Sequence, residues 1–261
     1  MKHLNQFITE YIIKKKLENP IDSEHNYKYF PATRQELFKI TQELIDKGQY
    51  DLNCINTERI TDMSNLFVKA PDIDISQWDV SNVKDMRYMF VDCENFNCDL
   101  SNWDVSNVEN MEGMFNKCGN FKGKGLDKWN VNSVKITEFM FIKCDKFDCD
   151  LSNWNVSKVE NMQNMFQDCK NFKGKGLDKW NVSNVKYMSS IFKNCEKFDC
   201  DVSNWNICNV IYMDYAFINC LSFTGKGLDK WNPQSLKDSE GIFDNCKSIK
   251  KYPKWYTDWF K

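Results

Sequence analysis

Tryptophan recurs along the chain at a spacing that alternates between 25 and 26 residues, and no other feature limits the fold so strongly. The ladder consists of Trp78, Trp103, Trp129, Trp154, Trp180, Trp205 and Trp231. A phenylalanine ladder from Phe90 to Phe243 and a cysteine ladder from Cys93 to Cys246 keep the same spacing. Self-similarity at such a period is typical of a fold in which each unit packs only on its neighbours. The sequence therefore predicts a stack of repeat units, which we call rungs.

Seven rungs carry all three ladders, and a degenerate eighth precedes them. Asp51 to Ile55 stands where Asp99 to Trp103 stands later, and Ala70 takes the place of the ladder cysteine. We therefore expect the repeat region to span residues 50–250.

Within a rung, the apolar spacing first suits a short helix and then a short strand. In the second rung the helical face consists of Val83, Met86, Met89, Phe90 and Cys93. Phe96, Cys98 and Leu100 then alternate with polar residues, which is the period of a half-buried strand. The sequence thus predicts an α/β repeat solenoid of the leucine-rich-repeat type, with one short strand and one helical segment per rung.

Both ends of the array need a cover, because a terminal rung exposes one apolar edge. Residues 1–49 are expected to form a helical cap. Its first helix is predicted at His3–Glu18, and its second opens with a capping box at Thr33 and closes at Gly48. Residues 251–261 are rich in aromatic side chains and are expected to cover the other end.

The run from Asp99 to Val108, followed by Met111, Met114, Phe115 and Cys118, resembles the repeat of BspA-like leucine-rich-repeat proteins. Such proteins occur on bacterial surfaces, among mycoplasma lipoproteins, and in some protists and giant viruses. The resemblance covers roughly residues 30 to 250 and recurs in every rung. It implies adhesion or partner binding and supplies no catalytic residue.

Charge and hydropathy exclude several classes of partner. Lys plus Arg number 35 against 37 Asp plus Glu, so there is no global attraction to nucleic acid. No apolar run is long enough to span a bilayer, and the first residues do not resemble a signal peptide. We therefore expect an intracellular protein without membrane insertion, while display on a cell or virion surface stays open.

The 12 cysteines invite a zinc, disulfide or catalytic interpretation. The only histidines, His3 and His25, precede the array, and equivalent side chains of stacked rungs point in parallel rather than at one another. Free, packed thiols fit better, so we expect no metal and no cofactor. The tryptophans are interpreted as stacked core residues rather than a platform for sugars or bases. The Lys122–Gly125 motif lacks the spacing of a phosphate-binding loop.

Opposite charges recur at equivalent positions of alternate rungs. The first predicted column consists of Asp99, Lys124, Asp150, Lys175, Asp201 and Lys226, and the second of Lys122, Asp148, Lys173 and Asp199. Stacked strands lie about 4.8 Å apart, so neighbours in a column are expected to form ion pairs on an exposed strand face. The first column is our candidate partner-binding face.

These observations predict a non-catalytic scaffold for protein–protein contact. A face of mixed charge favours a protein partner over nucleic acid, which prefers an uninterrupted basic stripe. A surface adhesin and a cysteine-dependent enzyme are the alternatives; native localisation tests the first and thiol reactivity the second. The sequence leaves the partner's identity and the oligomeric state open.

Overall fold

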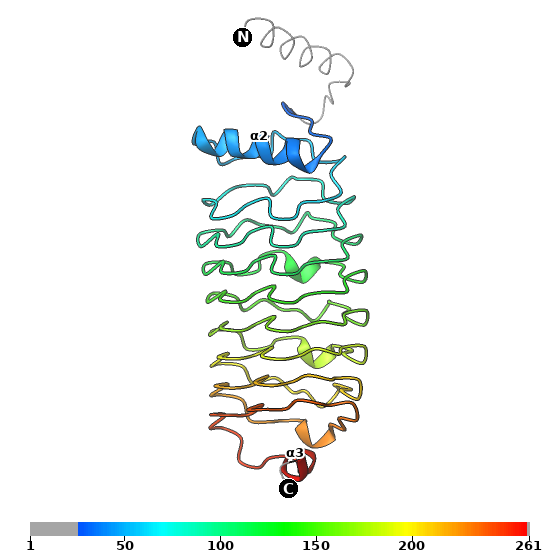
Figure 1. Ribbon diagram of the computed structural model, residues 1–261. Helices are drawn as coiled ribbons and strands as arrows, with labels where there is room; N and C mark the ends of the chain where they lie inside the picture. The colour runs from blue at the N-terminus through cyan, green and yellow to red at the C-terminus, as the bar shows by residue number, and fades with distance from the viewer. Residues whose placement is uncertain (1–25, 260–261) are drawn as a thin grey trace, which may run out of the picture.

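The computed structural model describes residues 26–259, and it is an elongated stack of rungs between two helices (Figure 1). The elements are α2 (Arg34–Asp46), three 3-10 turns η1 (Leu126–Lys128), η2 (Leu177–Lys179) and η3 (Leu228–Lys230), and α3 (Lys254–Trp259). The helix predicted at His3–Glu18 lies outside the described residues. No helix within residues 26–259 is both long enough and apolar enough to cross a membrane.

Helix α2 lies across the first rung, at the blue end of the stack (Figure 1). Thr33 is its N-cap, and the Thr33 hydroxyl accepts a hydrogen bond from the Glu36 amide at 3.2 Å. Glu36 reaches back to accept from the Ala32 amide at 2.7 Å, one residue before the N-cap, so the predicted capping box is formed with its second bond shifted by one residue. The buried side of α2 carries Leu37, Thr41 and Leu44, which places the helix over the apolar edge of the array.

Neighbouring rungs are joined by a parallel bridge at one position that recurs through the stack. The bridges link Asp62 to Asp85, Asp85 to Asn110, Asn110 to Ile136, Ile136 to Asn161, Asn161 to Tyr187, Tyr187 to Tyr212, and Tyr212 to Asp238. Each is an isolated bridge rather than part of an extended strand. Because each bridge joins equivalent positions of two successive rungs, all rungs are stacked in the same register.

The prediction of a helical segment between Val83 and Cys93 is wrong, because this part of the rung is a series of turns. Its alternate amides donate out of the rung: those of Met86, Tyr88, Phe90 and Asp92 bond to carbonyls of the next rung at 2.8–3.0 Å. Tyr88 and Asp92 have φ of +53° and +57°, in the left-handed region, which breaks a right-handed helix. The inward side chains nevertheless keep a helix-like spacing, and that spacing misled the sequence interpretation.

The strand expected at residues 96–101 is also absent from the secondary structure of the described chain. A few hydrogen bonds hold this segment instead. In alternate pairs of rungs one runs from an amide to the next rung's lysine carbonyl, for example from Leu100 to Lys124 at 3.1 Å. The bridges therefore lie on the segment that was predicted helical, and an irregular segment occupies the place of the predicted strand.

Aromatic ladders fill the interior from rung to rung. The rings of Phe90 and Phe115 stack at 5.4 Å, and those of Phe115 and Phe141 at 5.6 Å. Trp103 and Trp129 stack at 6.3 Å with their planes 2° apart. Each ladder indole also donates to a backbone carbonyl of a preceding rung. The tryptophans are thus core residues, as predicted, and offer no platform for sugars or bases.

The ladder cysteines lie beside these aromatic rings as free thiols. Cys118 donates to the Phe90 carbonyl at 2.9 Å, and Cys144 donates to the Phe115 carbonyl at 3.0 Å. Burial raises the pKa of both thiols well above the ordinary range. They therefore stay protonated and serve as small apolar residues that also satisfy one buried carbonyl each.

Helix α3 lies at the opposite end, shown in red (Figure 1). Trp255 stacks on Trp231 at 6.1 Å, and its indole donates to the Leu228 carbonyl at 2.8 Å. It thus continues the tryptophan ladder by one step beyond the last rung.

Candidate functional site

The first predicted charge column forms three ion pairs between neighbouring rungs, and we call its six residues the ladder side. Lys124 pairs with Asp99 at 2.9 Å, Lys175 with Asp150 at 2.8 Å, and Lys226 with Asp201 at 2.8 Å. Each pair joins two rungs whose ladder tryptophans lie 26 residues apart. Lys124 and Asp150, which are next to each other in the column, are not within ion-pair distance. The column is therefore a row of separate pairs rather than a continuous zipper.

Each aspartate of the ladder side contacts a lysine with one carboxylate oxygen and a serine with the other. In the pair with Lys175, Oδ2 of Asp150 faces the ammonium, while Oδ1 accepts hydrogen bonds from the Ser152 amide at 3.0 Å and from its hydroxyl. The Lys175 ammonium and Ser152 hold the pKa of Asp150 down at about 2. Ser101 and Lys124 lower the pKa of Asp99 to about 2 in the same way. These carboxylates are ionised at neutral pH, and each is neutralised by its own lysine.

The second predicted column is only partly paired. Lys173 and Asp148 form an ion pair at 2.5 Å. Asp199 accepts instead from the Thr224 amide at 2.9 Å and from its hydroxyl at 2.8 Å. The Lys122 amide bonds to the Asn97 side chain at 3.0 Å.

Glycines place the ladder lysines close to the preceding rung. Gly125 and Gly176 have φ near +90°, and a Cβ on Gly176 would lie 2.2 Å from the Ser152 amide nitrogen. A 3-10 turn follows each glycine and holds the extra residue of the 26-residue step. The Lys-Gly-Lys-Gly motif is therefore a packing device that lets two backbones approach.

A third column of alternating charge was missed in the sequence. It consists of Lys84, Glu109, Lys135, Glu160 and Lys186. Lys135 pairs with Glu109 at 2.7 Å, and Lys186 pairs with Glu160 at 2.7 Å. The sequence did contain the signal. Each of these residues directly follows a valine at the equivalent position of its rung, and the charge changes sign from one rung to the next.

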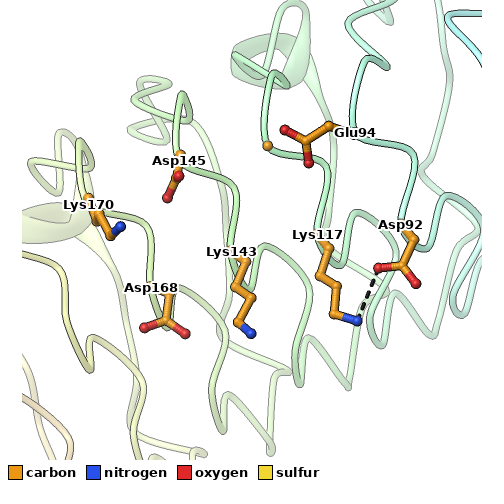
Figure 2. Close-up of a pocket in the computed structure, with 8 residues that line it drawn as sticks. Asp92, Glu94, Lys117, Lys143, Asp145, Asp168 and Lys170 are labelled. Atoms are coloured by element: carbon orange, nitrogen blue, oxygen red, sulfur yellow. Dashed lines mark ion pairs between the residues drawn. The ribbon is translucent and has the colours of Figure 1, made fainter. Parts of the chain in front are cut away.

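An open groove beside the cysteine ladder also has charges of both signs (Figure 2). Its lining consists of Asp92, Glu94, Lys117, Gly119, Lys143, Asp145, Asp168 and Lys170. Lys117 pairs with Asp92 at 3.1 Å, and Lys143 extends beside Lys117 from the next rung. The lining contains four carboxylates and three lysines, and no cysteine, serine or histidine.

A second groove lies over the bridges of the later rungs. It is lined by Gln163, Asn164, Tyr187, Ser189, Ser190, Tyr212 and Asp214. The rings of Tyr187 and Tyr212 stack at 6.0 Å with their planes 9° apart. The lining is polar and aromatic and has no lysine.

The cysteines outside the regular ladder and the possible metal ligands were also located. Within residues 26–259, no group of three or more His, Cys, Asp or Glu could hold a metal ion. Burial raises the pKa of Cys98 and Cys200 to about 12 and that of Cys149 to about 11, so their thiolates are scarce at neutral pH.

Comparison with known proteins identifies one family. The model of the family described as "Mycoplasma protein of unknown function, DUF285" matches residues 35–154 and again residues 138–256. A search among curated proteins found no match, and neither did a search among solved structures.

Proposed function

Because the chain belongs to the DUF285 family of mycoplasma proteins of unknown function, whose model matches it twice in tandem, we propose that it is a non-catalytic scaffold that binds another protein. One observation carries this proposal. Outward side chains recur in straight columns on a stack whose rungs are bonded to one another along their length. Such a stack offers a long, pre-ordered surface, and pre-ordering reduces the entropy lost on binding.

The fold class is part of the same proposal. We assign the stack to the leucine-rich-repeat kind of solenoid, with turns in place of the helical segment. The parallel bridges between neighbouring units of 25 or 26 residues support this assignment. The finer resemblance to BspA-like proteins, which rests on the run from Asp99 to Val108, stays a proposal beside it.

The ladder side is our candidate binding face. Its lysines are 65–70% exposed, so a partner reaches them easily, although each is already paired. The sign of the charge alternates along the column, which favours a protein surface with a matching alternation over the uniformly negative backbone of nucleic acid.

The test is affinity capture with two matched variants. The immobilised protein is incubated with a lysate of the organism that produces it, and retained proteins are quantified. The first double variant, Lys124→Gln with Lys175→Gln, changes the ladder side. The second double variant, Lys135→Gln with Lys186→Gln, changes the third column and serves as its control. Both variants remove two exposed, paired lysines.

We expect one protein to be retained saturably by the wild type and the third-column variant, and to be lost from the ladder-side variant. Equal retention by all three would contradict the choice of face. Saturable retention of no protein at all would contradict the scaffold function.

A further inference from the structure

The side of the stack that carries the parallel bridges has a different composition from the ladder side. We define the bridge face as the residue at each bridge together with the residue two places after it. It consists of Asp62 and Ser64, Asp85 and Arg87, Asn110 and Glu112, Ile136 and Glu138, Asn161 and Gln163, Tyr187 and Ser189, Tyr212 and Asp214, and Asp238 and Glu240. Not one of these residues is a lysine, in a chain in which lysine is abundant. Depletion of lysine and enrichment of tyrosine are typical of protein–protein interfaces, whereas acidic residues are usually depleted there, so their presence on this face needs a separate reason.

Acidic residues on this face far outnumber its single arginine. Arg87 forms an ion pair with Asp85 of the same rung at 2.8 Å. The remaining carboxylates, in the central and later rungs, are Glu112, Glu138, Asp214, Asp238 and Glu240. Negative charge therefore lies in two groups along this face, Glu112 with Glu138 and Asp214 with Asp238 and Glu240, separated by two rungs that place no charge on it. Within each group the sign does not alternate as it does on the ladder side.

The partners of these carboxylates are neutral hydrogen-bond donors. Glu112 accepts from the Tyr88 hydroxyl, and Glu138 accepts from the Asn161 amide at 2.7 Å. Asp214 accepts from the Ser189 hydroxyl. Burial and the neighbouring charge of Glu112 raise the pKa of Glu138. These hydrogen bonds orient the carboxylates without neutralising them. Arg87 acts electrostatically on Glu112 as well as on Asp85, whereas Glu138 has no cationic neighbour among the causes of its raised pKa.

Aromatic rings accompany these carboxylates. Tyr187 and Tyr212 stack in neighbouring rungs, and Tyr212 is 39% exposed. They form one wall of the groove that also contains Gln163 and Asn164. A half-buried tyrosine stacked on an exposed one, beside amide side chains, is the kind of surface on which binding energy concentrates in protein interfaces.

We propose that the bridge face binds a basic segment of a partner protein. Its lysine or arginine side chains lie against Glu112 and Glu138, and its aliphatic stems and backbone pack on Tyr187 and Tyr212. This inference rests on the proposed scaffold function and names the chemistry of a partner, at a face other than the ladder side.

A metal ion, a nucleic acid and an anionic membrane fit this face less well than a basic protein segment. A metal ion needs several carboxylates around one point, and within residues 26–259 no such group exists. Here the carboxylates are spread over successive rungs, which suits an extended chain with several positive charges. Nucleic acid and anionic membranes carry the same sign as the face and are repelled.

The test uses the full chain and a fluorescent peptide in which lysine and threonine alternate. Fluorescence anisotropy measures binding at low salt, and the matched probe is a peptide in which glutamate and threonine alternate. We expect the lysine peptide to bind saturably and to lose affinity as salt is added. The glutamate peptide is expected not to bind.

Two variants locate the site. The double variant Glu112→Gln, Glu138→Gln should weaken binding of the lysine peptide about fourfold, which is about twofold for each ion pair lost. The control, Glu109→Gln with Glu160→Gln, removes the same charge from the third column and should leave affinity unchanged within about twofold. Tyr187→Ser with Tyr212→Ser should also weaken binding about fivefold. Thermal melting verifies that each variant is folded.

The proposal is overturned if the lysine peptide fails to bind, if the glutamate peptide binds as well, or if the control variant weakens binding as much as the bridge-face variant. Its failure can be told apart from failure of the scaffold function. A captured protein that is lost from the Lys124→Gln, Lys175→Gln variant but kept by Glu112→Gln, Glu138→Gln would preserve the scaffold and reject the basic partner.

Discussion

The ladder side and the bridge face are built from the same rungs, yet they treat charge in opposite ways. On the ladder side Asp150 faces Lys175 in the next rung, and the two charges cancel. On the bridge face Glu138 is followed by Asn161 and preceded by Glu112, so its charge stays uncompensated. A repeat places equivalent residues of successive rungs in one column. The charges in a column cancel when neighbouring rungs carry residues of opposite charge, and they remain when the neighbouring residue is neutral or has the same charge. Self-neutralised columns support register, whereas uncompensated ones are available for a partner.

The largest expected difference between the two sides concerns glycine. Gly176→Ala on the ladder side should lower the free energy of unfolding by roughly 3 kcal/mol, because φ is +90° and the new Cβ meets the Ser152 backbone. Gly113→Ala, beside the bridge face, should cost about 2 kcal/mol, because φ is +58° and the three atoms nearest to the new Cβ all belong to the Tyr88 ring, which can move. Urea denaturation measures both.

A second substitution separates the two cases. The ring of Tyr88 can be removed, and residues other than glycine already occupy the position of Gly113 in other rungs with similar φ. Tyr88→Ala should therefore remove the part of the cost of Gly113→Ala that comes from the clash, and leave the strain of an alanine at φ +58°. No single side-chain truncation should rescue Gly176→Ala. Rescue at both glycines, or at neither, would contradict the distinction between backbone and side-chain contact.

The next prediction concerns the reactivity of the cysteines in the core, which lies between the ladder side and the bridge face. A thiol reagent added to native protein should label at most the three half-buried cysteines, Cys54, Cys149 and Cys208, while the nine buried thiols react only in denaturant. Cys149 should react slowly, because burial raises its pKa to about 11. Rapid native labelling of Cys144 or its ladder equivalents would show that the rungs open, and would revive the cysteine-enzyme alternative.

The sequence predicted those features of the two sides that depend on the period alone. Ladder tryptophans fixed which residues are neighbours, so the pairing of Asp99 with Lys124 could be anticipated. The turns between Val83 and Cys93 could not, because a chain that alternates right- and left-handed residues presents the same inward spacing as a helix. The bridge face was missed because an absence of lysine is informative only when the outward positions are known.

On the ladder side, Asp150→Asn should be mildly destabilising, by roughly 0.5 kcal/mol near neutral pH, since the pair is exposed and screened. The pKa of Asp150 is about 2 in the folded protein, below the value of about 3.9 in an unfolded chain. Its stabilising contribution is therefore present above about pH 4 and is lost as the pH falls through about 2. Urea denaturation at several pH values should show the wild type and the variant converge in acid; a constant gap would show that the ionic charge is not responsible.

The smallest effect should have the opposite sign, on the bridge face. The pKa of Glu138 is raised by burial and by Glu112, so ionisation is less favourable in the folded than in the unfolded protein. The stability associated with its protonated form is present below the unfolded value of about 4.3 and is lost as the pH rises through the folded one. Glu138→Gln should therefore raise the free energy of unfolding near neutral pH, by at most about 0.5 kcal/mol, and change nothing in acid. A glutamine oxygen can still accept from Asn161, so the hydrogen bond is kept. If the same substitution also weakens binding of the lysine peptide, this carboxylate is maintained at a cost in stability for the sake of a partner. A variant that is less stable at neutral pH would show that Glu138 already has a cationic neighbour, and that the two sides of the stack do not differ.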